Sequence, residues 1–278
     1  MADITSDMIK ELRERTQAGM LDCKKALIET NGDMEQATDF LRKKGLAAAN
    51  KKAGREAKEG IIAVKLTPER AILLEVNCET DFVAKNANFI KLSQELLDVI
   101  SKEDVSKTDV PASVEEMVKS SIGTIGENMG IGKFTQLKAE ANTVFASYVH
   151  SNNKIGVVIQ LETAAGAKPE VEELGKELAM QAAAAMPQYL NSSEIPESVI
   201  QKEKEIYFEQ MKDSGKPANV LEKIVEGKIN KFYSDVCLID QVYIKDSGKK
   251  ISDVIKDYSS KINDEIKVAK FIRFQVGA

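Results

Sequence analysis

The chain has 278 residues, a length that suggests two folded units of about 150 residues each, or two smaller units with an appendage. Hydrophobic residues make up 43% and charged residues 30%, a composition that excludes an intrinsically disordered chain and predicts a packed globular fold. The formal net charge of −5 excludes a global basic excess that would neutralise nucleic-acid phosphates.

The strongest local cluster of basic residues lies at Lys43, Lys44, Lys51, Lys52 and Arg55. Alanine, glycine and glutamate interrupt it, and no aromatic residue interleaves to stack on bases. We therefore interpret it as a solvated surface of a linker and expect no direct contact with nucleic acid.

Three cysteines, Cys23, Cys78 and Cys237, are too few and too widely spaced for a disulfide framework, so a reducing compartment is expected. The N-terminal residues lack the basic and apolar regions of a signal peptide. No run approaches the ~18 apolar residues of a membrane span. We expect a cytoplasmic protein that does not associate with membranes.

Residues 1–46 predict three short amphipathic helices. The first carries Met8 and Leu12 at helical spacing, the second follows Gly19, and the third begins after Asp33, a favoured N-cap residue, and ends at Gly45. Because a core of this size is only marginally stable by itself, we expect a docking domain tethered to the rest of the chain. Residues 47–60, which are rich in lysine and contain glycine, predict its linker.

From Ile61 the apolar period changes to that of strands. We predict an α+β subdomain over 61–141, whose elements are a hairpin of strands 61–66 and 71–78 with a turn at 67–70, helices at 86–103 and 112–127, and a strand at 134–141.

Residues 142–278 repeat this pattern and predict a second, related α+β subdomain. Its predicted elements are a hairpin of strands 143–149 and 155–161, a helix at 169–185, a strand at 237–244, a helix at 251–258 and a strand at 268–276. Residues 190–233 interrupt it with two charged helical segments separated by a turn at 213–217. Their apolar residues, including Val199, Ile206, Phe208 and Val225, suffice for one seam only, so we predict a projecting helical hairpin.

Residues for covalent, metal or phosphate chemistry are scarce. His150 is the only histidine, and no His, Cys and carboxylate cluster has metal-ligand spacing, so we expect neither a cofactor nor a metal site. The glycines at 123, 126, 130 and 132 lack the spacing of a dinucleotide-binding loop and are interpreted as a helix end and a turn. Cys23 and Cys78 fall in apolar segments where a reactive thiolate is disfavoured.

The segment from Thr80 to Asn86 follows an apolar strand and places Asp81 beside Phe82. Phe82 is out of phase with the buried face of the strand, which favours an exposed aromatic ring. An ordinary alternative is a core phenylalanine that begins the next helix, with Asp81 as its N-cap. The local sequence leaves both interpretations open.

Five segments, in order, resemble bacterial elongation factor Ts, the nucleotide exchange factor for elongation factor Tu, over nearly the whole length. These segments are 10–27, 75–85, 125–128, 215–228 and 271–277. The resemblance implies a ubiquitin-associated-like three-helix N-terminal domain, two related α+β subdomains and a projecting helical hairpin. It also implies a guanine nucleotide exchange factor that acts in translation elongation and is not an enzyme.

The resemblance further implies which residues contact elongation factor Tu in its GDP-bound and nucleotide-free forms. Asp81 and Phe82, within Thr80 to Val83, would insert beside the nucleotide and magnesium site of the partner. The other implied contacts are Arg13, Met20, Leu21 and Lys24 in the docking domain, Ile125, Gly126 and His150 in the core, and Ile244 and Lys245 near the C-terminus.

Two other functions fit the residues without the resemblance. One is a scaffold whose three-helix unit binds a different protein, because fold alone does not determine function. The other is a thiol enzyme that uses Cys23 or Cys78, which would require a nearby base although the only histidine is distant in sequence.

Overall fold

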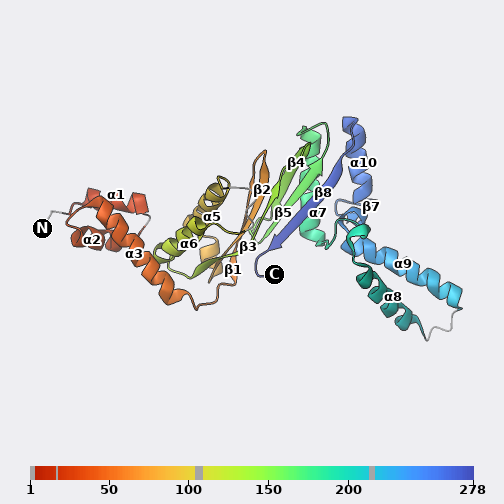
Figure 1. The fold of residues 1–278 in the computed structure, drawn as a ribbon, viewed down its shortest axis with the longest axis horizontal. Helices are drawn as coiled ribbons and strands as arrows, with labels where there is room; N and C mark the ends of the chain where they lie inside the picture. Colours follow the sequence, from red (N-terminus) through yellow and green to blue (C-terminus); the bar gives the residue numbers. More distant parts are fainter. Residues whose placement is uncertain (1–3, 17, 104–108, 213–216) are drawn as a thin grey trace.

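The computed structural model describes residues 4–16, 18–103, 109–212 and 217–278. The molecule is elongated, with three helices at one end, two three-stranded sheets in the middle and a helical hairpin at the other end (Figure 1). The predicted α+β class is confirmed. Among the described helices, none combines the length and apolar character that a membrane span requires.

The N-terminal unit consists of α1 (Ser6–Thr16), α2 (Met20–Glu29) and α3 (Met34–Lys52). Leu12, Cys23 and Leu27 are fully buried at its centre. Asp33 caps α3 as predicted, because its carboxylate accepts the backbone N–H groups of two residues in the first turn. Its likeness to a ubiquitin-associated domain stays a prediction.

Helix α3 does not end at Gly45, as the sequence predicted, but continues to Lys52. Gly45 is buried in the middle of α3, where the helix packs against α6 (Ala112–Ile125). The glycine therefore serves close helix packing and not helix termination. The first part of the predicted linker is thus a rigid helix that joins the N-terminal unit to the first sheet.

The first sheet is antiparallel with the order β1-β2-β3. Its strands are β1 (Glu59–Leu66), β2 (Arg70–Cys78) and β3 (Met129–Lys138). Helices α5 (Ala87–Ile100) and α6 pack against one face and enclose Phe89, Leu96 and Ile122. Strand β3 begins earlier than predicted and contains Gly130 and Gly132, so the interpretation of these glycines as a turn was wrong.

The second sheet has the order β4-β5-β8 and is also antiparallel. Its strands are β4 (Thr143–Val149), β5 (Ile155–Glu162) and β8 (Lys267–Gln275), and it packs against α7 (Pro169–Ala185), which in turn contacts α10 (Ile251–Ile262). In both sheets a hairpin is followed by helices, and a third strand then pairs with the second hairpin strand. The two subdomains therefore share one topology, as predicted.

Residues 237–244 do not form the single strand that the sequence predicted. They contain a 3-10 turn at Leu238–Asp240 and a two-residue strand β6 (Val242–Tyr243), which pairs with β7 (Asp246–Lys250). The buried side chain of Gln241 donates hydrogen bonds to the carbonyls of Ala185 and Asp235. These side-chain bonds hold the chain in a bend where the residue pattern favoured a strand.

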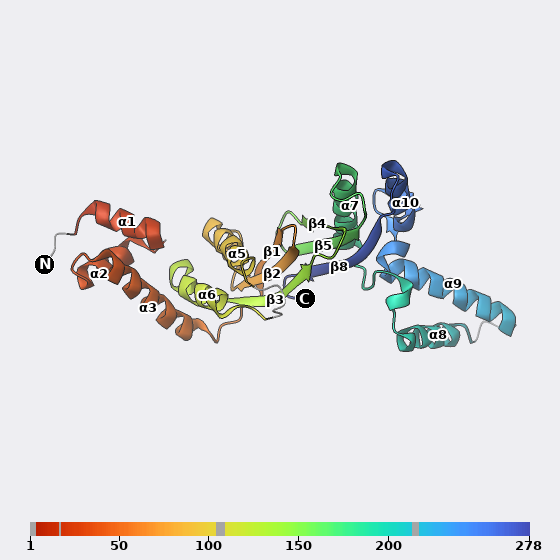
Figure 2. The same ribbon diagram turned by 45° about the horizontal axis from the view of Figure 1, so that its top comes forward.

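Helices α8 (Glu197–Met211) and α9 (Ala218–Val236) form the hairpin that projects from the second subdomain (Figure 2). Most of the predicted turn lies outside the described residues. Val225 and Ile229 of α9 are buried, but Ile206 and Phe208 of α8 are exposed and so do not contribute fully to the predicted seam.

The two sheets face each other across a second apolar layer that includes Leu73, Val158 and Phe274. Gly156 of β5 allows Ile62 of β1 to approach closely, since a Cβ atom at Gly156 would lie 2.4 Å from the Ile62 side chain. The subdomains therefore form one body. We keep the division of the chain at residues 46, 60 and 141 as a proposal.

Candidate functional site

The candidate site is α4 (Asp81–Ala84), a single helical turn that follows β2. Thr80 is its N-cap residue, and its hydroxyl accepts the backbone N–H of Val83 at 3.3 Å. Asp81 is therefore the first residue of the helix, and its interpretation as the N-cap was wrong.

Phe82 is 82% exposed, although the residues that follow it in α4 are anchored. Val83 packs against the core of the first subdomain and Ala84 is buried. The alternative of a core phenylalanine is thus excluded. A large apolar ring held in water by an anchored turn makes Phe82 a candidate contact residue for another protein.

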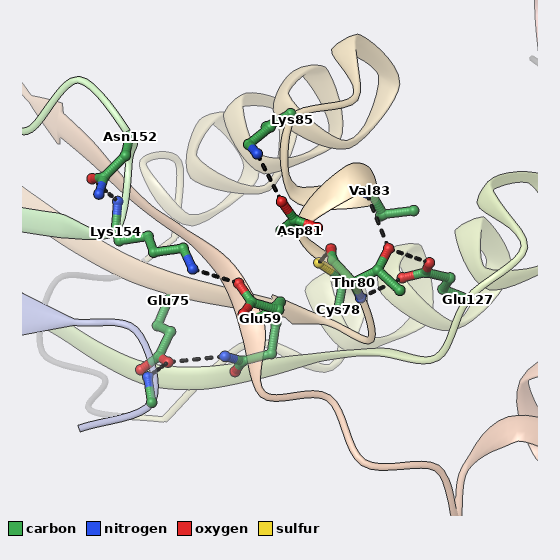
Figure 3. Close-up of polar contacts among 12 residues, drawn as sticks. Glu59, Glu75, Cys78, Thr80, Asp81, Val83, Lys85, Glu127, Asn152 and Lys154 are labelled. Carbon is green, nitrogen blue, oxygen red and sulfur yellow. Dashed lines mark hydrogen bonds and ion pairs between the residues drawn. The ribbon is translucent and has the colours of Figure 1, made fainter.

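Asp81 lies next to this ring and accepts a hydrogen bond from Lys85 Nζ at 2.7 Å (Figure 3). This hydrogen bond, with the positive charges of Lys85 and Lys154, lowers the pKa of Asp81 below its usual value. The site therefore presents an ionised carboxylate beside an exposed ring at neutral pH.

Ile125 and Gly126 lie beside the site because α6 ends there. Gly126 adopts φ 95° and turns the chain, and Glu127 then accepts hydrogen bonds from Thr80. Ile125 is partly buried and Gly126 is exposed. The structure thus brings Ile125 and Gly126 close to Thr80. Their part in binding stays a prediction.

His150 lies in the turn between β4 and β5, and its Nδ1 atom is 3.0 Å from the hydroxyl of Tyr148. The same turn contacts the first subdomain, since Asn153 accepts the N–H of Ile62 at 2.7 Å and Lys154 pairs with Glu59 at 2.6 Å. Lys154 connects this turn electrostatically to Asp81.

The remaining predicted contact residues lie away from α4. Arg13, Met20, Leu21 and Lys24 are exposed on α1 and α2, with Leu21 83% exposed. Ile244 and Lys245 lie in the β6–β7 connection of the second subdomain, on the side of α10 (Figure 1). Ile244 is 49% exposed, and Lys245 pairs with Glu177 of α7 at 2.6 Å.

The basic cluster around α3 is largely engaged within the chain. Lys44 pairs with Asp22, Lys52 donates to the carbonyl of Gly126, and Arg55 pairs with Glu79.

All three cysteines are buried. Burial raises the pKa of the Cys78 thiol to about 12 and that of Cys237 to about 11, so their reactive thiolate forms are scarce at neutral pH. The described residues contain no group of three or more His, Cys, Asp or Glu side chains that could hold a metal ion.

Sequence reasoning missed three residues that hold the site in place, namely Glu79, Glu127 and Lys154. Glu79 and Glu127 fall inside segments that carry the family resemblance, but nothing in their local pattern indicated that they bond to each other's segments. Their roles become visible only when the end of β2 lies beside the start of β3, where Cys78 pairs with Met129.

An exposed ring beside an ionised carboxylate, on an anchored turn of the first subdomain, suits a protein that acts by contacting another protein. The family model described as "Elongation factor TS" matches residues 79–278. The elongation factor Ts of Clostridium novyi (strain NT) is 43% identical over 99% of this chain and 93% of its own length. That of Rickettsia felis is 43% identical over 99% and 92%, and that of Desulfovibrio desulfuricans is 40% identical over the full length of both chains.

The chain therefore belongs to the elongation factor Ts family, whose members are the nucleotide exchange factors of elongation factor Tu in translation elongation.

Proposed function

We propose that this protein accelerates GDP release from elongation factor Tu by inserting Phe82 and Asp81 beside the partner's nucleotide and magnesium site. The observation that carries the proposal is the 82% exposure of Phe82 on an anchored helical turn. Membership of the elongation factor Ts family supports the choice of partner.

The driving force is thermodynamic linkage. A factor that binds nucleotide-free Tu more tightly than GDP-bound Tu weakens GDP binding by the same ratio. Burial of a phenylalanine side chain contributes roughly 1.5–3 kcal/mol, and about 1.4 kcal/mol corresponds to a tenfold change in an equilibrium constant. Phe82, if buried only in the complex with nucleotide-free Tu, shifts the balance between the two forms by about an order of magnitude or more.

Asp81 contributes charge to the same event. Its carboxylate is ionised at neutral pH and half-exposed, so it can approach the partner without first losing a proton. Magnesium prefers oxygen ligands in strict octahedral geometry, and a new carboxylate nearby disturbs the ion and its bound waters. No covalent bond is made or broken in this mechanism, and we propose that the protein is not an enzyme.

The remaining contacts fix the orientation of the two proteins relative to each other. We assign Arg13, Met20, Leu21 and Lys24 to the nucleotide-binding domain of Tu, and Ile125, Gly126 and His150 to contacts around the inserted turn. Ile244 and Lys245 are assigned to a separate contact on the second subdomain. Packing of α3 on α6 supports joint action, because it joins the docking helices to the body that carries α4.

We place this activity in the cytoplasm, with Tu in its GDP-bound and nucleotide-free forms as the partner, and without direct contact with nucleic acid or membranes. The test is release of fluorescent GDP from preloaded Tu. A strong acceleration at low micromolar concentrations of this protein is expected. An unchanged rate, with binding to other proteins intact, would instead favour the scaffold interpretation.

A further inference from the structure

The helical turn that carries Phe82 is attached to the segment after α6 by the carboxylate of Glu127. Glu127 Oε2 accepts the backbone N–H of Thr80 at 2.9 Å, and Glu127 Oε1 accepts the Thr80 hydroxyl at 2.6 Å (Figure 3). Thr80 is the N-cap residue of α4. A single side chain therefore fixes both the backbone and the side chain of the residue that begins the turn.

A second carboxylate makes the reciprocal contact. Glu79 Oε1 accepts the backbone N–H of Asn128 at 2.6 Å and pairs with Arg55 at 3.4 Å. The segments Glu79–Thr80 and Glu127–Asn128 are thus joined by crossed carboxylate-to-backbone bonds. Hydrogen bonds to ionised acceptors are about twice as strong as those between neutral groups, so this crossed pair is a firm attachment.

Helix α4 needs such an attachment. It has four residues, and an isolated helix of this length is unstable because nucleation costs more than one turn of hydrogen bonds returns. Val83 and Ala84 anchor one side of the turn in the core. Because Phe82 is almost fully exposed, few apolar contacts hold its ring, and its direction depends on the backbone of α4.

We propose that Glu127 is a positioning residue for exchange: it holds α4 in its docking conformation before the partner arrives. Ordering a flexible segment on binding costs conformational entropy, and a segment already ordered avoids that cost. Glu127 is partly buried and acts through Thr80. This role rests on the proposed function of Asp81 and Phe82.

The primary experiment measures stimulated GDP release from Tu with Glu127→Ala, Glu127→Gln and the parent. We expect Glu127→Ala to lower the maximal rate by about tenfold, the effect of leaving one or two residues to be ordered on binding. Glu127→Gln should retain an intermediate rate, because its amide oxygen still accepts one of the two bonds. Glu115→Ala is the matched control, since Glu115 is an exposed glutamate of α6 paired with Lys119, and it should leave the rate unchanged.

Measuring the effect of Glu127→Ala in two backgrounds separates a positioning role from a role in general stability. In a background that carries Asp81→Ala and Phe82→Ala, no functional side chain remains to be positioned, so Glu127→Ala should change the residual rate less than twofold. An equal loss in both backgrounds would overturn the positioning role while leaving the proposed function intact. A parent that does not accelerate GDP release would overturn the proposed function and this role with it.

Hydrogen exchange of the free protein gives a readout that does not need the partner. Glu127→Ala should raise amide exchange at Val83 and Ala84, and leave the amides of β2 and α5 protected. Uniformly faster exchange across the first subdomain would show that Glu127 serves stability in general, and would also overturn the proposal.

Discussion

Gly45 of α3 and Gly123 of α6 meet where the two helices cross, and a Cβ atom on Gly123 would lie 2.6 Å from the Cα atom of Gly45. A Cβ atom on Gly45 would lie equally close to the carbonyl oxygen of Ser120. Neither backbone can yield as a flexible side chain would. The N-terminal helices are therefore joined to the core through a contact that only glycine permits.

Replacing glycine by alanine inside a helix usually stabilises it, but at this helix crossing we expect the same replacement to destabilise the protein. Gly123→Ala should destabilise the protein by about 1–3 kcal/mol, because overpacking forces the helices apart. Gly227→Ala in α9 is the matched control: nothing lies within 4 Å of its added methyl group, so it should stabilise α9 by about 0.5–1 kcal/mol. Urea unfolding measures both. If Gly123→Ala stabilises the protein as Gly227→Ala does, the packing at the crossing is not as described.

Phe82→Ala should separate function from stability. Because the ring is 82% exposed, its loss should change the free energy of unfolding by no more than about 0.5 kcal/mol. Stimulated GDP release should fall by about tenfold or more, as the lost burial on the partner requires. Phe208→Ala on α8 is the matched control, since that ring is also exposed but lies in the projecting hairpin. Equal exchange by Phe82→Ala and the parent would remove Phe82 from the mechanism.

The pairing of Asp81 with Lys85 predicts a pH effect of defined sign. Since the folded protein lowers the pKa of Asp81, this pairing contributes stability above the unfolded pKa, and that contribution is lost as the pH falls through the lower folded pKa. In Lys85→Met the pKa should rise toward the usual aspartate value. An NMR titration of the Asp81 carboxyl group measures the shift, with Lys91→Met on α5 as the control. An unchanged pKa in Lys85→Met would mean that Lys85 is not its main partner.

The buried thiols predict resistance to alkylation. At pH 7.5 the native protein should react slowly with iodoacetamide at Cys78 and Cys237, whose pKa values burial raises to about 12 and about 11. The same protein in guanidinium chloride should react at all three cysteines. Mass spectrometry of the peptides gives the extent at each position. Rapid modification of native Cys78 accompanied by loss of activity would revive the thiol-enzyme interpretation.

Glu75 connects β2 to β3 and to the C-terminal residues, so we expect its replacement to lower the free energy of unfolding substantially. This residue of β2 is 4% exposed, and its carboxylate accepts N–H groups from Asn77, Lys133 and Gly277. Glu75→Ala should cost about 1–3 kcal/mol, because three part-buried hydrogen bonds to its carboxylate are lost. Glu75→Gln should cost less, since its amide oxygen still accepts. Thermal unfolding compares the two variants, and an equal, small shift in Tm would contradict the contacts at Glu75.

Elements whose ends depend on neighbouring residues in the sequence were predicted correctly, and elements that depend on distant residues were not. The helix at 169–185 was placed at both ends because Pro169 begins it and its apolar period is regular. Gly45 was misassigned because its buried environment comes from α6, which is far away in sequence. Gln241 was placed in a strand because nothing local shows that its side chain bonds to Ala185 and Asp235.

The candidate site shows the same division. The position of Asp81 and Phe82 at the end of a strand could be predicted, but their exposure could not. The same sequence also fits an N-cap aspartate followed by a core phenylalanine. The exposure depends on Val83 and Ala84 reaching the core and on Glu127 reaching Thr80. Both contacts require the tertiary structure.

The projecting hairpin is closed at its base. Val236 accepts the backbone N–H groups of Gln188 and Tyr189, and Leu238 and Ile239 donate in return to the carbonyls of Tyr189 and Leu190. The chain therefore leaves the second subdomain and re-enters it at nearly the same point. A change in the length of α8 and α9 therefore leaves the two ends of the hairpin, and the contacts between them, in place.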